Sequence, residues 1–207
     1  RDSSTSRGLG DVYKRQGHYF VPRYTRVVDT AESKDNINKA YNLISTSKVR
    51  NEMIIDDVIT CVARKQTPVI LTRFKEHAKF LHDALKKKAD HVFLLYGDNS
   101  DKENAEIRVK LKQIPENESL ILVATGQKIG EGFDFPRLDV LMLAAPVSFE
   151  GRLEQYVGRL NRDYVGKEAV YVYDYIDSHV RYFDKMYAKR LRTYRKMGFS
   201  IWTQELQ

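Results

Sequence analysis

The chain has 207 residues, a net charge of +7 at neutral pH and 42% hydrophobic residues, which suits one core-forming domain or one domain with an extension. No apolar run approaches the roughly 18 residues of a membrane span, and the polar start lacks the apolar segment of a signal peptide, so neither is predicted. A single cysteine, Cys61, excludes an internal disulfide and a cysteine-cluster metal site, so we expect a reducing, cytoplasmic setting.

The excess positive charge lies in two segments. Residues 1–16 hold four basic and two acidic residues, residues 178–207 hold seven basic and two acidic ones, and residues 17–177 are neutral overall. The first segment has no periodicity and resembles translated linker sequence, so we exclude it from the fold. The sequence therefore predicts a linker-like segment at 1–16, a lobe with a helical lead-in at 17–177, and a basic helix packed on that lobe at 178–207.

Hydrophobic periodicity predicts alternating helices and strands along the rest of the chain. In chain order we expect helices 33–45 and 52–65, strand 68–71, helix 74–88, strand 91–96, helix 101–113, strands 119–124 and 139–144, helix 150–162, strand 168–174 and helix 178–197. This order predicts an α/β fold with a mostly parallel sheet and helices on both faces. Cys61 falls on the apolar face of its helix, so we expect a buried, inert thiol.

Sheets of this kind bind ligands at the carboxyl ends of their strands. Thr72 and Arg73 lie at one such end, and Thr125 and Gly126 lie at another. The alternatives for Thr72 and Arg73 are a helix N-cap and a surface arginine.

Residues 124–134 form a glycine-rich stretch. Its glycines allow close backbone approach, and exposed N–H groups in such a turn can hold phosphate. The alternative is a flexible connection with Asp134 as a turn former. Further on, Gln155, Arg159 and Arg162 are spaced i, i+4 and i+7, which places all three on one face of a helix. Two guanidiniums on one face suit a polyphosphate, and the alternative is a solvated helix face.

These two stretches together resemble motifs V and VI of superfamily-two helicases, the DEAD/DEAH-type motors, in their second RecA-like lobe. The closest resemblance is to the bacterial branch with restriction-enzyme-like helicase subunits, whose motif V is of the A-T-G-x-x-I-G-E-G-F-D type. It covers roughly residues 17–200, and it departs from the pattern at Asn161, where relatives often have histidine.

The resemblance implies an ATP-dependent enzyme with ATP held between this lobe and a first lobe, which would also hold Mg²⁺. The catalytic residues would be Arg159 and Arg162, one of them acting as an arginine finger. The residues expected to contact the nucleotide are Gly130, Gly132, Asp134 and Gln155.

The implied partners are the first lobe and a nucleic-acid strand, with DNA favoured over RNA. Family contacts to the strand fall on Thr72, Arg73, Thr125 and Gly126. From charge patterning, helix 178–197 adds a basic face opposite an apolar stripe. It is either an electrostatic track or an ordinary solvated face, and it carries Arg181, Lys185, Lys189, Arg192 and Lys196.

The sequence contains no G-x-x-x-x-G-K-[ST] run and no DEAD- or DEAH-like tetrad, so we expect the chain alone to be inactive as an ATPase. The five histidines lack metal spacing, and Asp174 and Asp177 are interpreted as an end-of-strand turn rather than a nuclease pair. Two other functions stay open: a non-catalytic nucleic-acid-binding module with the same fold, and a nucleotide-sugar transferase.

Overall fold

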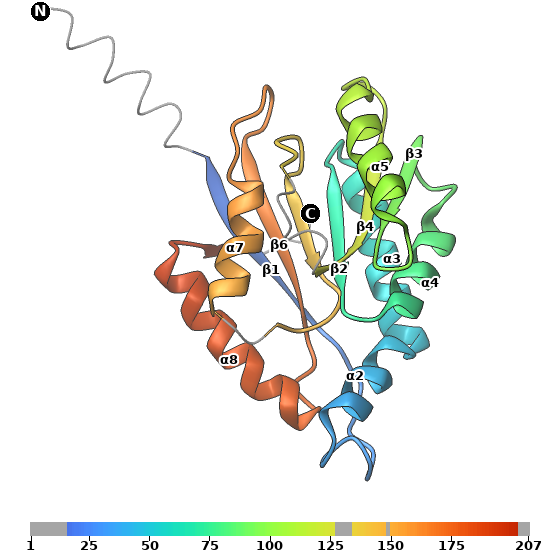
Figure 1. The fold of residues 1–207 in the computed structure, drawn as a ribbon. Coiled ribbons are helices and arrows are strands. Elements are labelled where there is room, and N and C mark those ends of the chain that lie inside the picture. Colours follow the sequence, from blue (N-terminus) through green and yellow to red (C-terminus); the bar gives the residue numbers. More distant parts are fainter. Residues whose placement is uncertain (1–15, 127–133, 148–149, 203–207) are drawn as a thin grey trace, which may run out of the picture.

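The computed structural model describes residues 16–126, 134–147 and 150–202 (Figure 1). Its strands are β1 Gly17–Tyr24, β2 Pro68–Thr72, β3 His91–Leu95, β4 Leu120–Thr125, β5 Val140–Leu143, β6 Ala169–Ile176 and β7 Ser200–Ile201. Its helices are α2 Ile37–Ser45, α3 Lys48–Ala63, α4 Lys75–Leu85, α5 Asp101–Gln113, α7 Glu150–Leu160 and α8 Arg181–Lys196.

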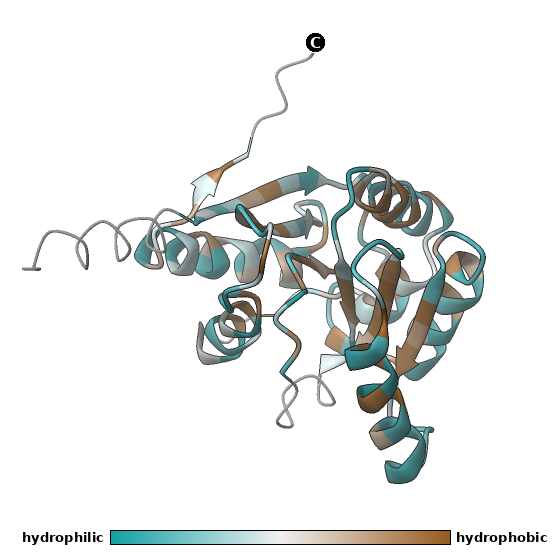
Figure 2. Ribbon diagram, turned by 90° about the horizontal axis from the view of Figure 1, so that it is seen from above, coloured by the Kyte–Doolittle hydropathy of each residue, from teal (hydrophilic) through white to brown (hydrophobic). Residues whose placement is uncertain are grey.

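The strands form a seven-stranded sheet in the order β3-β4-β2-β5-β6-β1-β7, and every described pairing is parallel. Helices α3 and α4 cover one face, and α5, α7 and α8 cover the other (Figure 1). Parallel sheets are covered on both faces, and the inner strands β2, β4 and β5 are accordingly apolar except for the threonines that end β2 and β4. Strands β1 and β6 also carry polar residues, and Figure 2 shows both brown and teal segments on the sheet. The predicted α/β architecture is confirmed.

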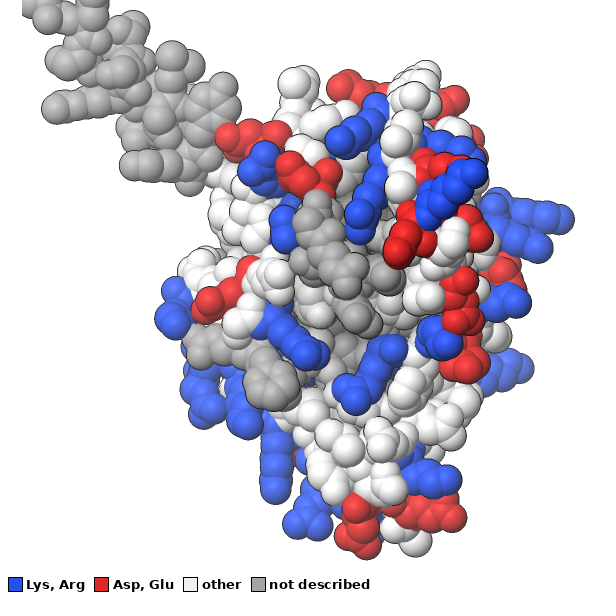
Figure 3. Space-filling view, viewed as in Figure 1, with Lys and Arg blue, Asp and Glu red and all other residues white. Residues whose placement is uncertain are grey.

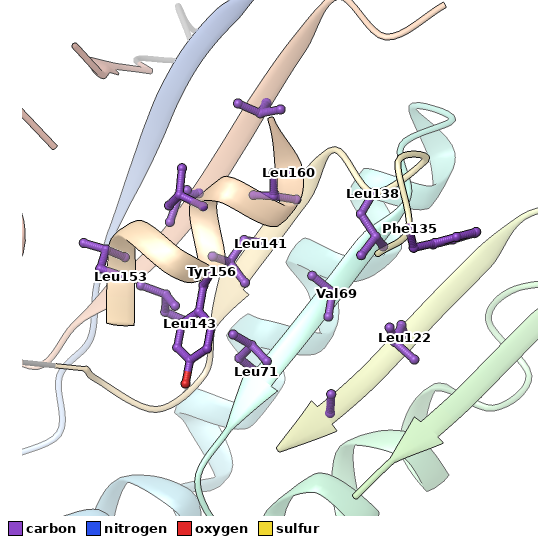
Figure 4. Close-up of a cluster of buried hydrophobic side chains, with 14 of the residues drawn as sticks. Val69, Leu71, Leu122, Phe135, Leu138, Leu141, Leu143, Leu153, Tyr156 and Leu160 are labelled. Carbon is purple, nitrogen blue, oxygen red and sulfur yellow. The ribbon is translucent and has the colours of Figure 1, made fainter. Parts of the chain in front are cut away.

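Period-two alternation divides the core into two layers. Val69 and Leu71 of β2 belong to the cluster beneath α7, whereas Ile70 between them belongs to the cluster beneath α3 and α4. Figure 4 shows the labelled side chains of α7 lying against those of β2 and β5. Leu153 and Leu160 of α7 are fully buried there. Each contributes about 2 kcal/mol from apolar burial, which fixes α7 on the sheet.

Two strands were not predicted. β1 lies between β6 and β7 and pairs with β6 along its whole length. Its Pro22 argues against a central strand, but β7 pairs only with Tyr19 and Phe20, so the proline faces no neighbour on that side. Arg23 Nε donates to Asp57 Oδ2 of α3 at 2.9 Å, which ties β1 to the helical layer.

The predicted end-of-strand turn at Asp174 is wrong, because this residue lies inside β6 and is fully buried. Arg190 of α8 donates to both of its carboxylate oxygens at 2.8 Å, and Tyr194 Oη donates to one of them at 2.7 Å. Just beyond β6, Asp177 accepts from Arg50 of α3 at 3.0 Å on each oxygen. The two pairs hold helices from opposite faces against β6, a structural role.

Most boundaries agree with the sequence prediction to within three residues. The Ser100 side chain accepts from the Glu103 backbone N–H at 3.1 Å and so caps the start of α5. Cys61 is fully buried, and burial raises the pKa of its thiol to about 11, as expected for an inert residue. Residues 1–15 of the linker-like segment lie outside the described residues. None of the described helices combines the length and apolar character needed to cross a membrane.

Candidate functional site

A cleft of about 700 Å³ opens at the carboxyl ends of β2, β4 and β5, between α2 and the start of α7. It includes five residues that were predicted to bind nucleic acid or nucleotide. Lying far apart in sequence, they meet here because parallel strands end at one edge of the sheet. These residues are Thr72, Arg73, Thr125, Gly126 and Gln155.

The wall of the cleft is basic. It contributes Arg73, Lys75 and Arg152, and no Asp or Glu occurs among the described residues that line it. Lys75 also pairs with exposed Asp98, with 2.7 Å between Nζ and Oδ1. The excess of cations suits a polyanionic ligand.

Arg73 is held at the cleft by an aromatic ring. Its guanidinium carbon lies 4.4 Å from the centroid of the Tyr41 ring, a cation–π contact. Tyr41 is itself fixed because its Oη donates to the Pro146 carbonyl at 3.0 Å. The arginine is exposed, so its guanidinium is oriented by the ring and remains open to a phosphate.

Thr72 is buried, and its hydroxyl lies 2.5 Å from His77 Nδ1. His77 Nε2 lies 2.8 Å from Asn51 Oδ1, an oxygen that can only accept, while the amide nitrogen of Asn51 donates to the Ser45 carbonyl. The imidazole therefore carries its proton on Nε2 and accepts from Thr72 at Nδ1. Burial lowers the pKa of His77 to about 3, so the ring is neutral. The Thr72 hydroxyl proton is committed to His77 and is not free for a phosphate.

Gly126 is required by close packing. A Cβ built on it would lie 2.6 Å from Oη of Tyr156, a buried residue of α7. Any larger side chain would displace the tyrosine from the cleft wall, so this position demands glycine for space alone.

The arginines of the second motif lie apart from the cleft lining. Helix α7 ends at Leu160, so the prediction of a helix through residue 162 is wrong, and Arg162 does not share the helix face of Gln155 and Arg159. Arg162 Nη2 instead donates to Asp134 Oδ2 at 3.3 Å. This ion pair is exposed, and it joins the two motifs that the sequence singled out. Gly130 and Gly132 lie outside the described residues.

Helix α8 has the predicted two-sided character. Phe183 and Tyr194 are buried against the lobe, whereas the predicted nucleic-acid contacts Lys185, Lys189 and Arg192 are exposed. Figure 3 shows Lys and Arg side chains gathered over α8. None of these residues lines the cleft.

Sequence reasoning missed Tyr41, Lys75, Arg152 and Tyr156 as cleft residues. Arg152 could have been found, since it lies three residues before Gln155 and so on the same side of α7. Tyr41 left no local signal, because only tertiary packing brings α2 to the strand ends. In the parts of the chain that the structure describes, no three His, Cys, Asp or Glu residues are grouped to hold a metal ion.

Residues 49–163, more than half of the chain, match the helicase conserved C-terminal domain family. The chain belongs to this family. Transcript termination protein A18 of Yaba-like disease virus is 29% identical to this helicase lobe over 138 residues, which are 64% of the chain and 28% of A18. The chain thus spans little more than a quarter of the length of such relatives.

Two solved structures resemble this lobe in fold. T4 UvsW has a TM-score of 0.68 at 20% identity, covering 91% of this chain and 41% of UvsW. The C-terminal domain of the DEAD-box protein Dbp5 has a TM-score of 0.52 at 12% identity, covering 90% of this chain and 89% of that domain. The RecA-like fold and the assignment to a superfamily-two helicase C-terminal lobe are confirmed.

The finer assignment to the restriction-enzyme-like branch is not supported, since the relatives include viral transcript termination proteins and a putative helicase of invertebrate iridescent virus 6. The assignment rested on two short motifs, and matches to short motifs carry a high risk of false positives.

Proposed function

We propose that this helicase lobe is the second motor lobe of an ATP-dependent nucleic-acid helicase or translocase. The observation that carries the proposal is the basic cleft at the carboxyl edge of the sheet, which gathers the residues expected to touch the strand. Family membership makes nucleic acid the polyanion to test first.

In this proposal the cleft holds the phosphate backbone of a single strand. Arg73, oriented by Tyr41, and Arg152 from the opposite wall supply charge to successive phosphates. Backbone groups at Thr125 and Gly126 lie at the end of β4, where glycine permits close approach. Phosphate contacts of this kind position a strand without reading its sequence.

A second group of residues, near the end of α7, offers charged side chains that suit the phosphates and the ribose of ATP. Arg159 and Arg162 offer guanidiniums at the end of α7, and Asp134 offers a carboxylate suited to ribose hydroxyls. The Arg162–Asp134 pair is exposed and therefore weakly stabilised, so the guanidinium can exchange the carboxylate for a phosphate. Bound ATP would supply the phosphoryl-transfer chemistry that drives the motor. No described acidic cluster fits Mg²⁺, which we assign to another lobe.

A binding experiment can decide whether the strand is DNA or RNA. DNA is the strand that the sequence favoured, while the name of A18 refers to transcript termination, so DNA and RNA both need testing. Fluorescence anisotropy of labelled single strands of each type, titrated with the 207-residue chain over a range of salt, gives both affinity and salt slope.

We expect the Arg73→Gln/Arg152→Gln variant to bind more weakly and to lose about 1.4 from its salt slope, at about 0.7 per phosphate contact on single strands. Lys86→Gln, at the exposed C-cap of α4, is the control and should bind like the wild type. An unchanged slope in the double variant would remove the cleft from the strand path. The alternative of a non-catalytic nucleic-acid-binding module predicts instead that the complete protein shows no strand-stimulated ATP turnover.

A further inference from the structure

Lys167 places its ammonium group among three backbone carbonyls. Its Nζ donates to Pro136 O at 3.1 Å, to Arg162 O at 2.9 Å and to Leu160 O. The side chain is half-buried, and the turn before it is formed by Gly166 with φ +82° and a bond from Lys167 N to Tyr164 O. The turn folds the chain back so that the lysine reaches the end of α7.

The three carbonyls belong to two separate segments. Leu160 and Arg162 close α7 and the arginine motif, whereas Pro136 follows Asp134 by two residues on the other motif. A lysine that only capped the helix would bind carbonyls of α7 alone. Lys167 binds both segments, next to the place where Arg162 meets Asp134.

We propose that Lys167 is a positioning residue that holds Arg162 and the end of α7 against the segment carrying Asp134. The inference rests on the proposed function, since it names the group that supports the nucleotide side of that site. Lys167 itself touches neither Arg162's guanidinium nor Asp134's carboxylate in any described bond, so its effect passes through the backbone.

An ammonium is the group that this position needs. It has three N–H donors and no acceptor, which matches three carbonyl oxygens. A neutral amine has two donors and a lone pair, so deprotonation would turn one bond into repulsion against an oxygen. Arginine keeps the charge, but its planar fork does not reproduce the geometry.

The charge state of Lys167 is sensitive to pH. Burial lowers the pKa of its ammonium to about 8, and the negative charges of Asp139 and Asp163 act in the opposite direction. Burial in turn raises the pKa of Asp139 to about 6, so this neighbour is ionised before Lys167 titrates. The full set of three bonds is therefore present below about pH 8, and one of the three is lost as pH rises through that value.

The test is a side-chain NMR titration of the isotopically labelled 207-residue chain between about pH 4 and about pH 11. It follows the Lys167 side chain, the backbone amides of Arg162 and Asp134, and the Arg162 Nε–H. We expect one shared midpoint near 8 for all of them, separate from the transition of Asp139 near 6.

Three variants separate positioning from bulk stability. In Lys167→Met the Arg162 and Asp134 chemical shifts should match the high-pH values of the wild type at every pH. In Lys167→Arg these shifts should show no transition near pH 8. Lys196→Met is the matched control: it removes an exposed ammonium of α8 that lies 3.7 Å from Glu154 of α7, and it should leave the titration unchanged. If Lys167→Met fails to fold, the wild-type titration decides by itself.

Arg162 and Asp134 signals that do not respond to the Lys167 titration, whatever its midpoint, would overturn the inference. The readout contains neither nucleotide nor strand. If the proposed function failed, ATP turnover would not depend on Arg162, but the coupling of the Arg162 and Asp134 signals to Lys167 would remain. The two failures are therefore distinguishable.

Discussion

Arg162 shows how a short motif can be right in composition and wrong in local geometry. The sequence placed it on a helix face with Gln155, but α7 ends two residues before it. Its position is set by the exposed pair with Asp134 and by the lysine that binds its carbonyl. The backbone of Arg162 is thus held by Lys167, whereas its guanidinium makes only an exposed ion pair that it can exchange for a ligand.

In the complete protein, Arg162→Ala should lower strand-stimulated ATP turnover by roughly 10³-fold, the scale of a lost arginine finger. Stability should change by less than about 1 kcal/mol, because the pair that it breaks is exposed. Steady-state ATPase rates and strand-binding isotherms measure both, with exposed Arg195→Ala as the control. Intact turnover together with abolished strand binding would show that Arg162 faces the strand instead.

His77 is the residue whose burial has the clearest pH consequence. Its pKa falls from 6.5 in the unfolded chain to about 3 in the fold, so between these values the unfolded state binds more protons. The contribution of His77 to the free energy of unfolding is fully present above about pH 6.5 and is lost as pH falls towards 3. The loss amounts to about 5 kcal/mol at most, at 1.36 kcal/mol per pKa unit.

Denaturant unfolding at a series of pH values tests this effect. His77→Gln should be less stable than the wild type at neutral pH, yet should lose less stability on acidification. His82→Gln, from the same helix but at a partly exposed position, should follow the wild-type curve. Parallel curves for the wild type and His77→Gln would mean that folding does not shift the pKa of the imidazole.

At the scale of elements, α8 serves two purposes on two faces. Its apolar face docks on the lobe through Phe183 and Tyr194, and Arg190 continues that docking as a buried pair with Asp174. Arg190 therefore contributes no charge to the outer face, although the sequence counted it with the basic residues. The exposed cations that remain on α8 are the five of the predicted stripe and Arg195.

If the stripe guides the phosphate backbone, replacing Lys185, Lys189, Arg192 and Lys196 with glutamine should weaken binding of every strand sequence alike. On single strands, the slope of log affinity against log salt should shrink by about 0.7 for each phosphate that is no longer neutralised. A control with equal charge loss replaces the exposed Lys79, Lys86, Lys87 and Lys88. If the α8 variant and the control variant had equal salt slopes, the basic stripe would not contact the strand and would serve solubility alone.

At the scale of the whole molecule, the lobe presents two candidate ligand surfaces from one sheet. The basic cleft lies at the ends of β2, β4 and β5, and the two arginines of the second motif lie at and just beyond the end of α7. Neither surface contains a phosphate-gripping lysine loop or a metal-holding acidic tetrad, since the sequence has no such motif. Phosphoryl transfer requires both parts.

The 207-residue chain alone should consequently hydrolyse ATP at a rate indistinguishable from the background, with or without a single strand. A coupled ATPase assay on the pure chain measures this, and the Arg162→Ala chain serves as its baseline. A robust rate that this substitution abolishes would show that the lobe carries a complete active site.

The sequence by itself determined the order of helices and strands from residue 33 to residue 197, most of their boundaries and five of the residues that line the cleft. This was possible because apolar runs such as 68–71 and 120–124 are uninterrupted, and because parallel strands place their carboxyl ends together. The glycine and arginine motifs then identified the family. All of these signals are local or follow from the direction of the strands.

Only the tertiary structure decided which side chains complete the site. It placed β1 beside β6, brought Tyr41 beneath Arg73, committed the Thr72 hydroxyl to His77, and closed Lys167 on three carbonyls. Each contact joins residues whose chemistry permits several partners. Packing and burial select among those partners, since a buried polar group must find a bonding partner wherever the fold supplies one.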